Sequence, residues 1–387
     1  MFNFDYYNPT RVIFGKDRLG DIEKYVPTDA KVLITYGGGS AKRSGLIDNV
    51  KAVLGNRTVF EFGGIEANPN YETLVKGIEI AKKENIDFLL AVGGGSVIDG
   101  TKFIALAACY DGVASDLFTA GFPVPYDVVG TAIPIGTVVT LPASGSEVTN
   151  GAVITYGNGK IPVHSDLEIP KFSILDPTLT FSLPKTQVAN GVIDAFAHVI
   201  EQYLTYPVDA RVQDRIAEGV LQTLIEIGET TVAEPENYDA RANHVWSATM
   251  AMIGVIGIGV PWDLTSHFIG HELTSLFGID HGQTLAVILP SVMDVRREKK
   301  HAKLVQYAER VWNIENGSED EKIDLAIKKT REFFESLGAK THLSEYGVGA
   351  DKIPAVVELL KTHGFTAMSE TSDLTLDISQ EILEKSL

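Results

Sequence analysis

The stretch that decides the fold is Phe88-Leu89-Leu90-Ala91-Val92-Gly93-Gly94-Gly95-Ser96-Val97-Ile98-Asp99. Its first five residues form a continuous apolar run, which is typical of a strand buried on both faces of a parallel sheet. Three glycines then break the strand, and Ser96 can cap a helix that starts beside it. A strand that turns through glycines directly into a helix is half of a βαβ unit, so the stretch predicts an α/β fold.

Similar strand signals lie on both sides of this stretch. Before it come β-branched or aromatic runs at 31–36 and 58–62, and the apolar residues of 71–85 recur at helical spacing. After it, 133–141 and 172–175 are again strand-like. The alternation predicts a Rossmann-like parallel sheet with crossover helices.

The second half of the chain has a different pattern. Strand signals nearly vanish after Leu183, and long helical patterns follow. These patterns cover 187–204, 209–227, 241–256 and 263–277. Because 387 residues exceed one ordinary core, we predict an α/β dinucleotide-binding domain over 1–183 and an all-helical domain over 184–387.

Composition excludes several classes of partner. The formal net charge of −18 argues against a nucleic acid and against an anionic membrane surface. The longest apolar run, near 250–260, is shorter than the ~20 residues that span a bilayer. The first residues lack the pattern of a signal peptide, and Cys109 is the single cysteine, within an apolar run. We therefore expect a cytoplasmic protein with Cys109 buried and no membrane partner.

Glycine-rich loops follow two strands of the predicted sheet. Gly93–Gly95 end one strand and Gly37-Gly38-Gly39-Ser40 end another, while 140–147 places hydroxyls and a glycine after a third. Nucleotides bind at this carboxyl edge, where glycines and a helix N-terminus admit a pyrophosphate. None of the loops has the spacing G-x-G-x-x-G or that of a P-loop, and each alone could be a plain tight turn. Together they indicate a dinucleotide site.

The choice of nicotinamide cofactor follows from the loop 37–40. A NAD site usually ends an early strand with an acid that binds the ribose 2′-hydroxyl. Here the strand ends in glycines and Ser40, and Lys42 and Arg43 follow. Ser40 could bond a 2′-phosphate, and Arg43 or Lys42 could neutralise it. We therefore predict that NADP(H) is preferred over NAD(H).

Acidic and histidine side chains recur at helical spacing in the second half. Asp194 and His198 stand four residues apart in an apolar segment, so a helix would place both on one face. His267 and His271 repeat this spacing, and His281 follows after a short turn. Three histidines and a carboxylate can hold Zn²⁺ or Fe²⁺, although each could instead be an ordinary buried polar residue. The zinc-protease pattern H-E-x-x-H is excluded because serine replaces its second histidine.

Two segments around these residues carry a family resemblance. The segment 175–201 resembles the first signature of the iron-containing (group III) alcohol dehydrogenases, and 267–273 with His281-Gly282 resembles the second. The loop 36–40 is similar to that of the branch of NADPH-dependent aldehyde reductases and butanol dehydrogenases. The resemblance covers essentially the whole chain, including 8–15, 62–69 and 93–99.

The resemblance implies roles for individual residues. The metal ligands that it implies are Asp194, His198, His267 and His281. The implied cofactor contacts are Gly38, Ser40, Asn68, Gly94, Gly95, Ser96, Asp99, Thr140, Ser144 and Lys160. His271 would lie near the metal and the nicotinamide without being a ligand. The resemblance also implies a homodimer, and it leaves the identity of the metal undecided between zinc and iron.

The implied reaction is hydride transfer between NADP(H) and small, mostly aliphatic aldehydes or primary alcohols, in a cleft between the two domains. The metal would polarise the carbonyl. His271 would either relay the proton or hydrogen-bond around the metal.

Three other functions stay open. A lyase similar to dehydroquinate synthase would share this architecture, and a glycerol-type polyol dehydrogenase would share the chemistry. A charged, phosphorylated substrate needs many Lys and Arg, whereas the ligand segments carry mostly apolar residues such as Trp262 and Leu264. A non-catalytic metal- or nucleotide-binding protein would bind NADPH without consuming it.

Overall fold

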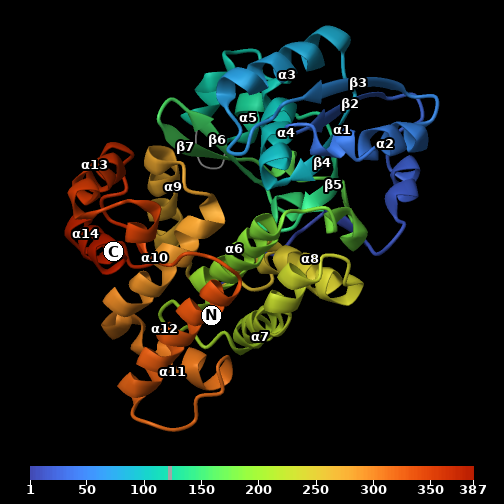
Figure 1. Cartoon of the computed structure of the whole chain (residues 1–387). Coiled ribbons are helices and arrows are strands. Elements are labelled where there is room, and N and C mark those ends of the chain that lie inside the picture. Colours follow the sequence, from blue (N-terminus) through green and yellow to red (C-terminus); the bar gives the residue numbers. More distant parts are fainter. Residues whose placement is uncertain (121–123) are drawn as a thin grey trace. The chain divides into compact units, whose positions relative to one another are not determined.

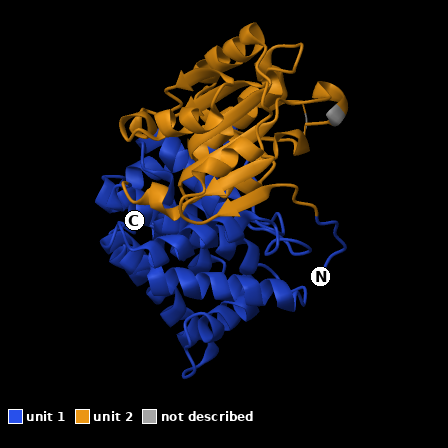
Figure 2. Ribbon diagram, turned by 90° about the vertical axis from the view of Figure 1, so that its right-hand side faces the viewer, with its two compact units in different colours: residues 1–6, 183–387 blue, residues 7–182 orange. Residues whose placement is uncertain are grey.

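The chain divides into two compact units in the computed structural model, which describes residues 1–120 and 124–387 (Figure 1). One unit comprises residues 7–182, and the other comprises residues 1–6 and 183–387 (Figure 2). The first contains the strands of the main sheet, and the second is helical.

A six-stranded parallel sheet forms the centre of unit 7–182. Its order is β1-β8-β5-β4-β2-β3, and each neighbouring pair runs parallel. The strands are β1 Arg11–Phe14, β2 Lys31–Tyr36, β3 Thr58–Gly63, β4 Phe88–Gly94, β5 Ile135–Leu141 and β8 Phe172–Leu175. The predicted parallel sheet is confirmed, and β1 is an edge strand outside the predicted set.

Helices cover both faces of this sheet. The α-helices among the described residues of this unit are α1 Ser40–Arg43, α2 Leu46–Leu54, α3 Tyr71–Glu84, α4 Gly95–Ala107 and α5 Tyr126–Val129. Val32 and Ile34 of β2 share a buried core with α2. On the other face, Thr35 Oγ1 lies 2.6 Å from Thr101 Oγ1 of α4. Because both faces are covered there, the inner strands β2 and β4 are almost fully buried and mainly apolar, and this is why apolar runs predicted them.

The direction in which the chain crosses the sheet changes between β2 and β4. From β2 the chain passes through α2 to β3 on one side, and then through α3 to β4 on the other. Open α/β sheets bind ligands at such a switch point, outside the carboxyl ends of the strands. Gly37–Gly39 and Gly93–Gly95 occupy these two strand ends, so the fold places both predicted glycine loops at the switch point.

A separate antiparallel hairpin lies outside the predicted elements. Its strands are β6 Gly151–Tyr156 and β7 Gly159–His164. The turn between them contains Gly157 with a φ of 62°, a left-handed conformation that favours glycine. The Thr155 N–H donates to Pro69 O at 2.8 Å, and this hydrogen bond holds the hairpin beside the loop that follows β3.

The second unit is built from long helices. They are α6 Lys185–Tyr203, α7 Arg211–Ala233, α8 Tyr238–Met252, α9 Thr265–Phe277, α10 His281–Val295, α11 Arg297–Arg310, α12 Glu319–Ser336, α13 Ile353–Thr362 and α14 Leu376–Lys385. One core includes α6, α7, α8, α10, α11 and α12, and another joins α9, α10, α13 and α14. The predicted helical region is confirmed. Helix α6 is buried from Val188 to Tyr203 except at Asn190, so the polar side chains within it need partners.

The first six residues belong to the helical unit. The Phe2 N–H donates to Gly259 O at 2.9 Å, and the Tyr6 hydroxyl donates to Ile253 O at 3.1 Å. The chain therefore passes between the units twice, after Tyr6 and after Ser182. The predicted boundary between residues 183 and 184 lies beside the second crossing, and the first crossing has no counterpart in the prediction.

Two further expectations concern burial and membranes. Cys109 follows the end of α4 and is half-buried, so its predicted full burial is wrong. Among the helices of the described residues, none is long and apolar enough to cross a membrane.

Candidate functional site

Four side chains singled out by the sequence lie on three helices of the helical unit. Asp194 and His198 belong to α6, His267 belongs to α9, and His281 is the first residue of α10. Ligand atoms of Asp194, His267 and His281 lie within 4.8 Å of one another. His198 stands beside this group, with its ring stacked on that of His267 at a centroid distance of 4.5 Å. The structure thus brings the four predicted ligands together, three of them in one tight group.

The distances around Asp194 test whether these donors suit one metal ion. Asp194 Oδ1 lies 3.5 Å from His267 Nε2, and 3.7 Å from both His281 Nε2 and His198 Nδ1. Good hydrogen bonds are shorter than this. Donors held at about 2.1 Å from a tetrahedral metal stand about 3.4 Å apart. The group therefore fits a divalent metal, and its nitrogen and oxygen donors suit zinc and iron alike.

Burial and neighbouring charges set the protonation of this group. Burial raises the pKa of Asp194, but the histidines outweigh it and hold that pKa below its ordinary range. Burial lowers the pKa of His198 to about 4, so its ring is neutral at neutral pH. Burial also lowers the pKa of His267, but Glu201 and Asp194 together raise it to about 10. Two carboxylates beside one imidazole create a negative potential that favours a cation.

His271 lies one turn beyond His267 on α9. Its ring centroid is 4.9 Å from that of His281 and 6.2 Å from that of His267. The side chain is half-buried. An imidazole in this position can exchange protons between the metal group and solvent.

In the other unit, predicted cofactor residues gather at the carboxyl end of β4. Gly95 opens α4, and a Cβ at this position would lie 2.2 Å from Ser144 Oγ. Ser96 Oγ accepts a hydrogen bond from the Asn68 N–H at 3.2 Å. The N-cap of α4 is Gly94, whose lack of a side chain leaves the first turn of α4 without a side-chain cap. A pyrophosphate could take that place.

The remaining predicted cofactor residues lie on neighbouring elements. They are Gly38 and Ser40 after β2, Thr140 in β5, and Lys160 in β7. Lys160 is paired with Thr155 across the hairpin, and the Thr155 hydroxyl donates to Asn68 O at 3.3 Å. The β6–β7 hairpin, which lies outside the predicted elements, thus joins Lys160 to the Asn68 loop.

Asp99 is engaged within the protein. Its Oδ1 accepts a hydrogen bond from Ser146 Oγ at 2.5 Å, and its Oδ2 accepts one from the Val153 N–H at 3.0 Å. Burial raises the pKa of this carboxyl. Asp99 therefore fastens α4 to β6 and to the loop that contains Ser144, and these contacts support a structural role in holding that loop.

A carboxylate from a neighbouring strand lies beside the loop that follows β2. Glu61 Oε2 of β3 is 3.1 Å from Lys42 Nζ and accepts a hydrogen bond from the Tyr36 hydroxyl at 2.9 Å. Lys51 pairs with the other oxygen, and this contact contributes most to lowering the pKa of Glu61 to about 2. The residues that follow β2 include no acid, and Glu61 reaches this loop from the neighbouring strand β3. Lys42 already pairs with Glu61. Arg43 is exposed, and its Nη1 donates a hydrogen bond to Gly38 O at 3.3 Å.

Two family profiles match the chain. Residues 9–177 match the family described as iron-containing alcohol dehydrogenase, and residues 188–385 match the Fe-containing alcohol dehydrogenase family, C-terminal. The chain belongs to the iron-containing alcohol dehydrogenase family.

Individual relatives agree with this family. The NADPH-dependent aldehyde reductase YqhD of Escherichia coli (strain K12) is 53% identical over 390 residues, which are 99% of each chain. The NADH-dependent butanol dehydrogenase A of Clostridium acetobutylicum is 37% identical over 396 residues, with full coverage of both. The solved substrate- and cofactor-free aldehyde reductase YqhD from E. coli is 51% identical, with a TM-score of 0.93 and full coverage of both chains. The predicted resemblance is confirmed.

One further residue of this iron-containing alcohol dehydrogenase, Glu201, lies beside a predicted metal ligand and was not among the predicted site residues. Glu201 lies in the last turn of α6, three residues after His198. Its Oε2 is 2.5 Å from His267 Nδ1. A glutamate one helical turn from a predicted ligand, in an apolar segment, was the signal that could have revealed it.

Proposed function

We propose that this iron-containing alcohol dehydrogenase reduces small, mostly aliphatic aldehydes to primary alcohols with NADPH, and catalyses the reverse oxidation. The observation that carries the proposal is the convergence of three histidines on Asp194 Oδ1. A relative that is 53% identical over nearly the full chain is an NADPH-dependent aldehyde reductase. Glycine loops at the switch point of the sheet add a place for the nucleotide.

The metal group supplies one half of the proposed chemistry. Asp194, His198, His267 and His281 hold one divalent cation, either zinc or iron. When bound, that cation supplies Lewis-acid polarisation of a carbonyl oxygen. Asp194 contributes the negative charge of the shell, and His271 delivers the proton that completes the alcohol.

The nucleotide loops supply the other half. The N-terminus of α4 and Ser96 bind the pyrophosphate of NADPH, whose nicotinamide supplies the hydride. Arg43 and Ser40 hold the 2′-phosphate. Glu61 does not oppose this binding, because Lys42 and Lys51 already balance its charge.

Substrate preference follows from the residues ahead of α9. Trp262 and Leu264 are half-buried and apolar, which favours uncharged aliphatic aldehydes over sugar phosphates. We further propose that the protein acts in the cytoplasm as a homodimer. Its single cysteine and its net charge of −18 support the location.

An assay of NADPH oxidation with butanal tests the function. We expect turnover that stops when the metal is chelated and returns with Zn²⁺ or Fe²⁺. His267→Ala should lose both metal and turnover. NADPH binding without oxidation would support a binding protein instead, and faster turnover of a sugar phosphate than of butanal would contradict the proposed substrate class.

A further inference from the structure

Glu201 holds His267 through two separate contacts. Its Oε2 lies 2.5 Å from His267 Nδ1, and its Oε1 accepts a hydrogen bond from the His267 backbone N–H at 3.1 Å. His267 is the third residue of α9, so this N–H belongs to the first turn, which has no partner within the helix. One buried carboxylate therefore fixes both the backbone and the ring of the same histidine.

The two nitrogens of the His267 ring face different carboxylates. Nε2 faces Asp194 Oδ1 at 3.5 Å, and Nδ1 faces Glu201 Oε2. A nitrogen and an oxygen only 2.5 Å apart need a proton between them. A proton held between Nδ1 and the carboxylate leaves Nε2, on the Asp194 side of the ring, as the nitrogen that a metal can take.

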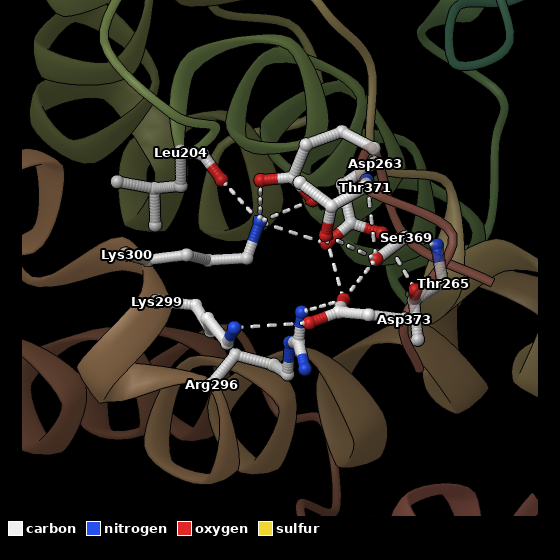
Figure 3. Close-up of polar contacts among 10 residues, drawn as sticks. Leu204, Asp263, Thr265, Arg296, Lys299, Lys300, Ser369, Thr371 and Asp373 are labelled. Atoms are coloured by element: carbon white, nitrogen blue, oxygen red, sulfur yellow. Dashed lines mark hydrogen bonds and ion pairs between the residues drawn. The ribbon is translucent and has the colours of Figure 1, made fainter. Parts of the chain in front are cut away.

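A buried ionic network supports the start of the same helix. The Asp263 N–H donates to Glu201 O at 2.8 Å, and Asp263 Oδ1 accepts hydrogen bonds from the N–H and the hydroxyl of Thr265. Asp263 Oδ2 is 2.8 Å from Lys300 Nζ of α11. Lys300 Nζ also donates to Leu204 O at 2.6 Å, just beyond the end of α6 (Figure 3). The first turn of α9 is thus fixed to α6 and α11 by buried polar contacts.

We propose that Glu201 is a positioning residue for the metal centre, which orients His267 and keeps its Nδ1 protonated so that Nε2 binds the metal. The proposal rests on the metal centre of the proposed function. Carboxylates that accept the second N–H of a ligand histidine typically change metal affinity 10- to 100-fold when removed. A residue that only capped α9 would affect folding without a specific effect on the metal.

Glu201→Gln separates these two roles. Glutamine has the same shape, and its oxygen can still accept the His267 backbone hydrogen bond. Its amide would then face Nδ1 with a donor, which favours the proton on Nε2 and opposes metal binding. Glu272→Gln is the matched control. Glu272 is an equally buried glutamate of α9, 2.7 Å from Nδ1 of His363, which lies outside the metal group.

The experiment is a Zn²⁺ titration of the metal-stripped full-length protein in competition with a chromogenic chelator. We expect Glu201→Gln to bind Zn²⁺ about 10- to 100-fold more weakly than the parent, and Glu272→Gln to match the parent. Equal affinity of Glu201→Gln and the parent would overturn the positioning role alone. A parent that binds neither Zn²⁺ nor Fe²⁺ would instead overturn the metal centre of the proposed function.

A second measurement does not depend on the variant folding. In the zinc-loaded parent, ¹⁵N spectra of the histidine rings should show the His267 proton on Nδ1. A proton on Nε2 would overturn the proposal.

Discussion

Replacing Lys300 by methionine should destabilise the helical unit strongly, because Lys300 neutralises two buried acids. Its Nζ lies 2.8 Å from Asp263 Oδ2 and 3.0 Å from Glu370 Oε1. All three side chains are 3 to 4% exposed. Methionine fills a similar volume but leaves two carboxylates together without a cation. Breaking a buried pair in this way costs about 3 to 5 kcal/mol. At about 2 to 4 °C per kcal/mol for a unit of this size, the Tm should fall by roughly 10 °C.

The loss should depend on pH with a definite sign. Burial raises the pKa of Glu370 more than Lys300 lowers it. Burial also raises the pKa of Asp263, but Lys300 outweighs this and holds it below its usual range. Without Lys300, both folded-state pKa values rise above their unfolded values. Above these raised pKa values both carboxylates must be charged or bind protons in the folded state, so the free energy of unfolding of the variant is lowered. The variant regains stability as the pH falls through the raised pKa values. The difference in Tm should therefore be larger at pH 8 than at pH 5.5.

Lys299→Met is the matched control. Lys299 is 65% exposed and lies 3.3 Å from Asp373 (Figure 3). An exposed pair is worth about 1 kcal/mol or less, so its Tm should change by a few degrees at most. Thermal unfolding of both variants, followed by circular dichroism, checks the prediction. Equal losses in the two variants, or a Lys300→Met loss that does not change with pH, would refute the reasoning.

Three further substitutions test the nucleotide loops and the proton path. A Cβ at Gly38 would meet no atom within 4 Å, so the Gly38→Asp side chain should fit. Because the new carboxylate repels a 2′-phosphate, the NADPH-to-NADH ratio of kcat/KM should fall by about tenfold or more. An unchanged ratio would contradict the predicted site. Gly95→Ala should weaken NADPH binding by about tenfold, or 1.4 kcal/mol, in a fluorescence titration, because the added Cβ would displace the loop that contains Ser144. Gly219→Ala is the control: its Cβ would meet no atom within 4 Å, so this variant should bind NADPH like the parent. His271→Ala should retain its zinc but lose activity and change its pH–rate profile, and full activity with an unchanged profile would remove the relay.

The main sheet and the helical region could be predicted from the sequence because their patterns are local. The apolar run 88–92 and the helical spacing of Asp194 and His198 each reflect one element and its own periodicity. The hairpin was missed although Tyr156-Gly157-Asn158-Gly159 is a turn signal, since Pro162 in the second strand weakens that strand's pattern.

Contacts between distant segments could not be predicted in this way. Glu61 reaches Lys42 only because β3 pairs with β2, and no pattern near residue 42 reveals it. Lys300 likewise belongs to a helix with ordinary surface composition, and its burial depends on acids 37 and 70 residues away along the chain, as their numbers show. Periodicity identifies the face of a helix, whereas the partner of a charged side chain depends on the tertiary fold.

The attachment of residues 1–6 to the helical unit affects how the chain can fold during synthesis. Phe2 and Tyr6 leave the ribosome before residues 7–182, and their partners Gly259 and Ile253 are made about 250 residues after them. At about 5 to 20 residues per second, the aromatic segment waits roughly 10 to 50 s while all of residues 7–182 emerge. The α/β unit can therefore complete its sheet as an inserted domain, with both of its ends still attached to a unit that has not yet formed. During that interval the aromatic side chains at the start of the chain are open to chaperones or to misassociation.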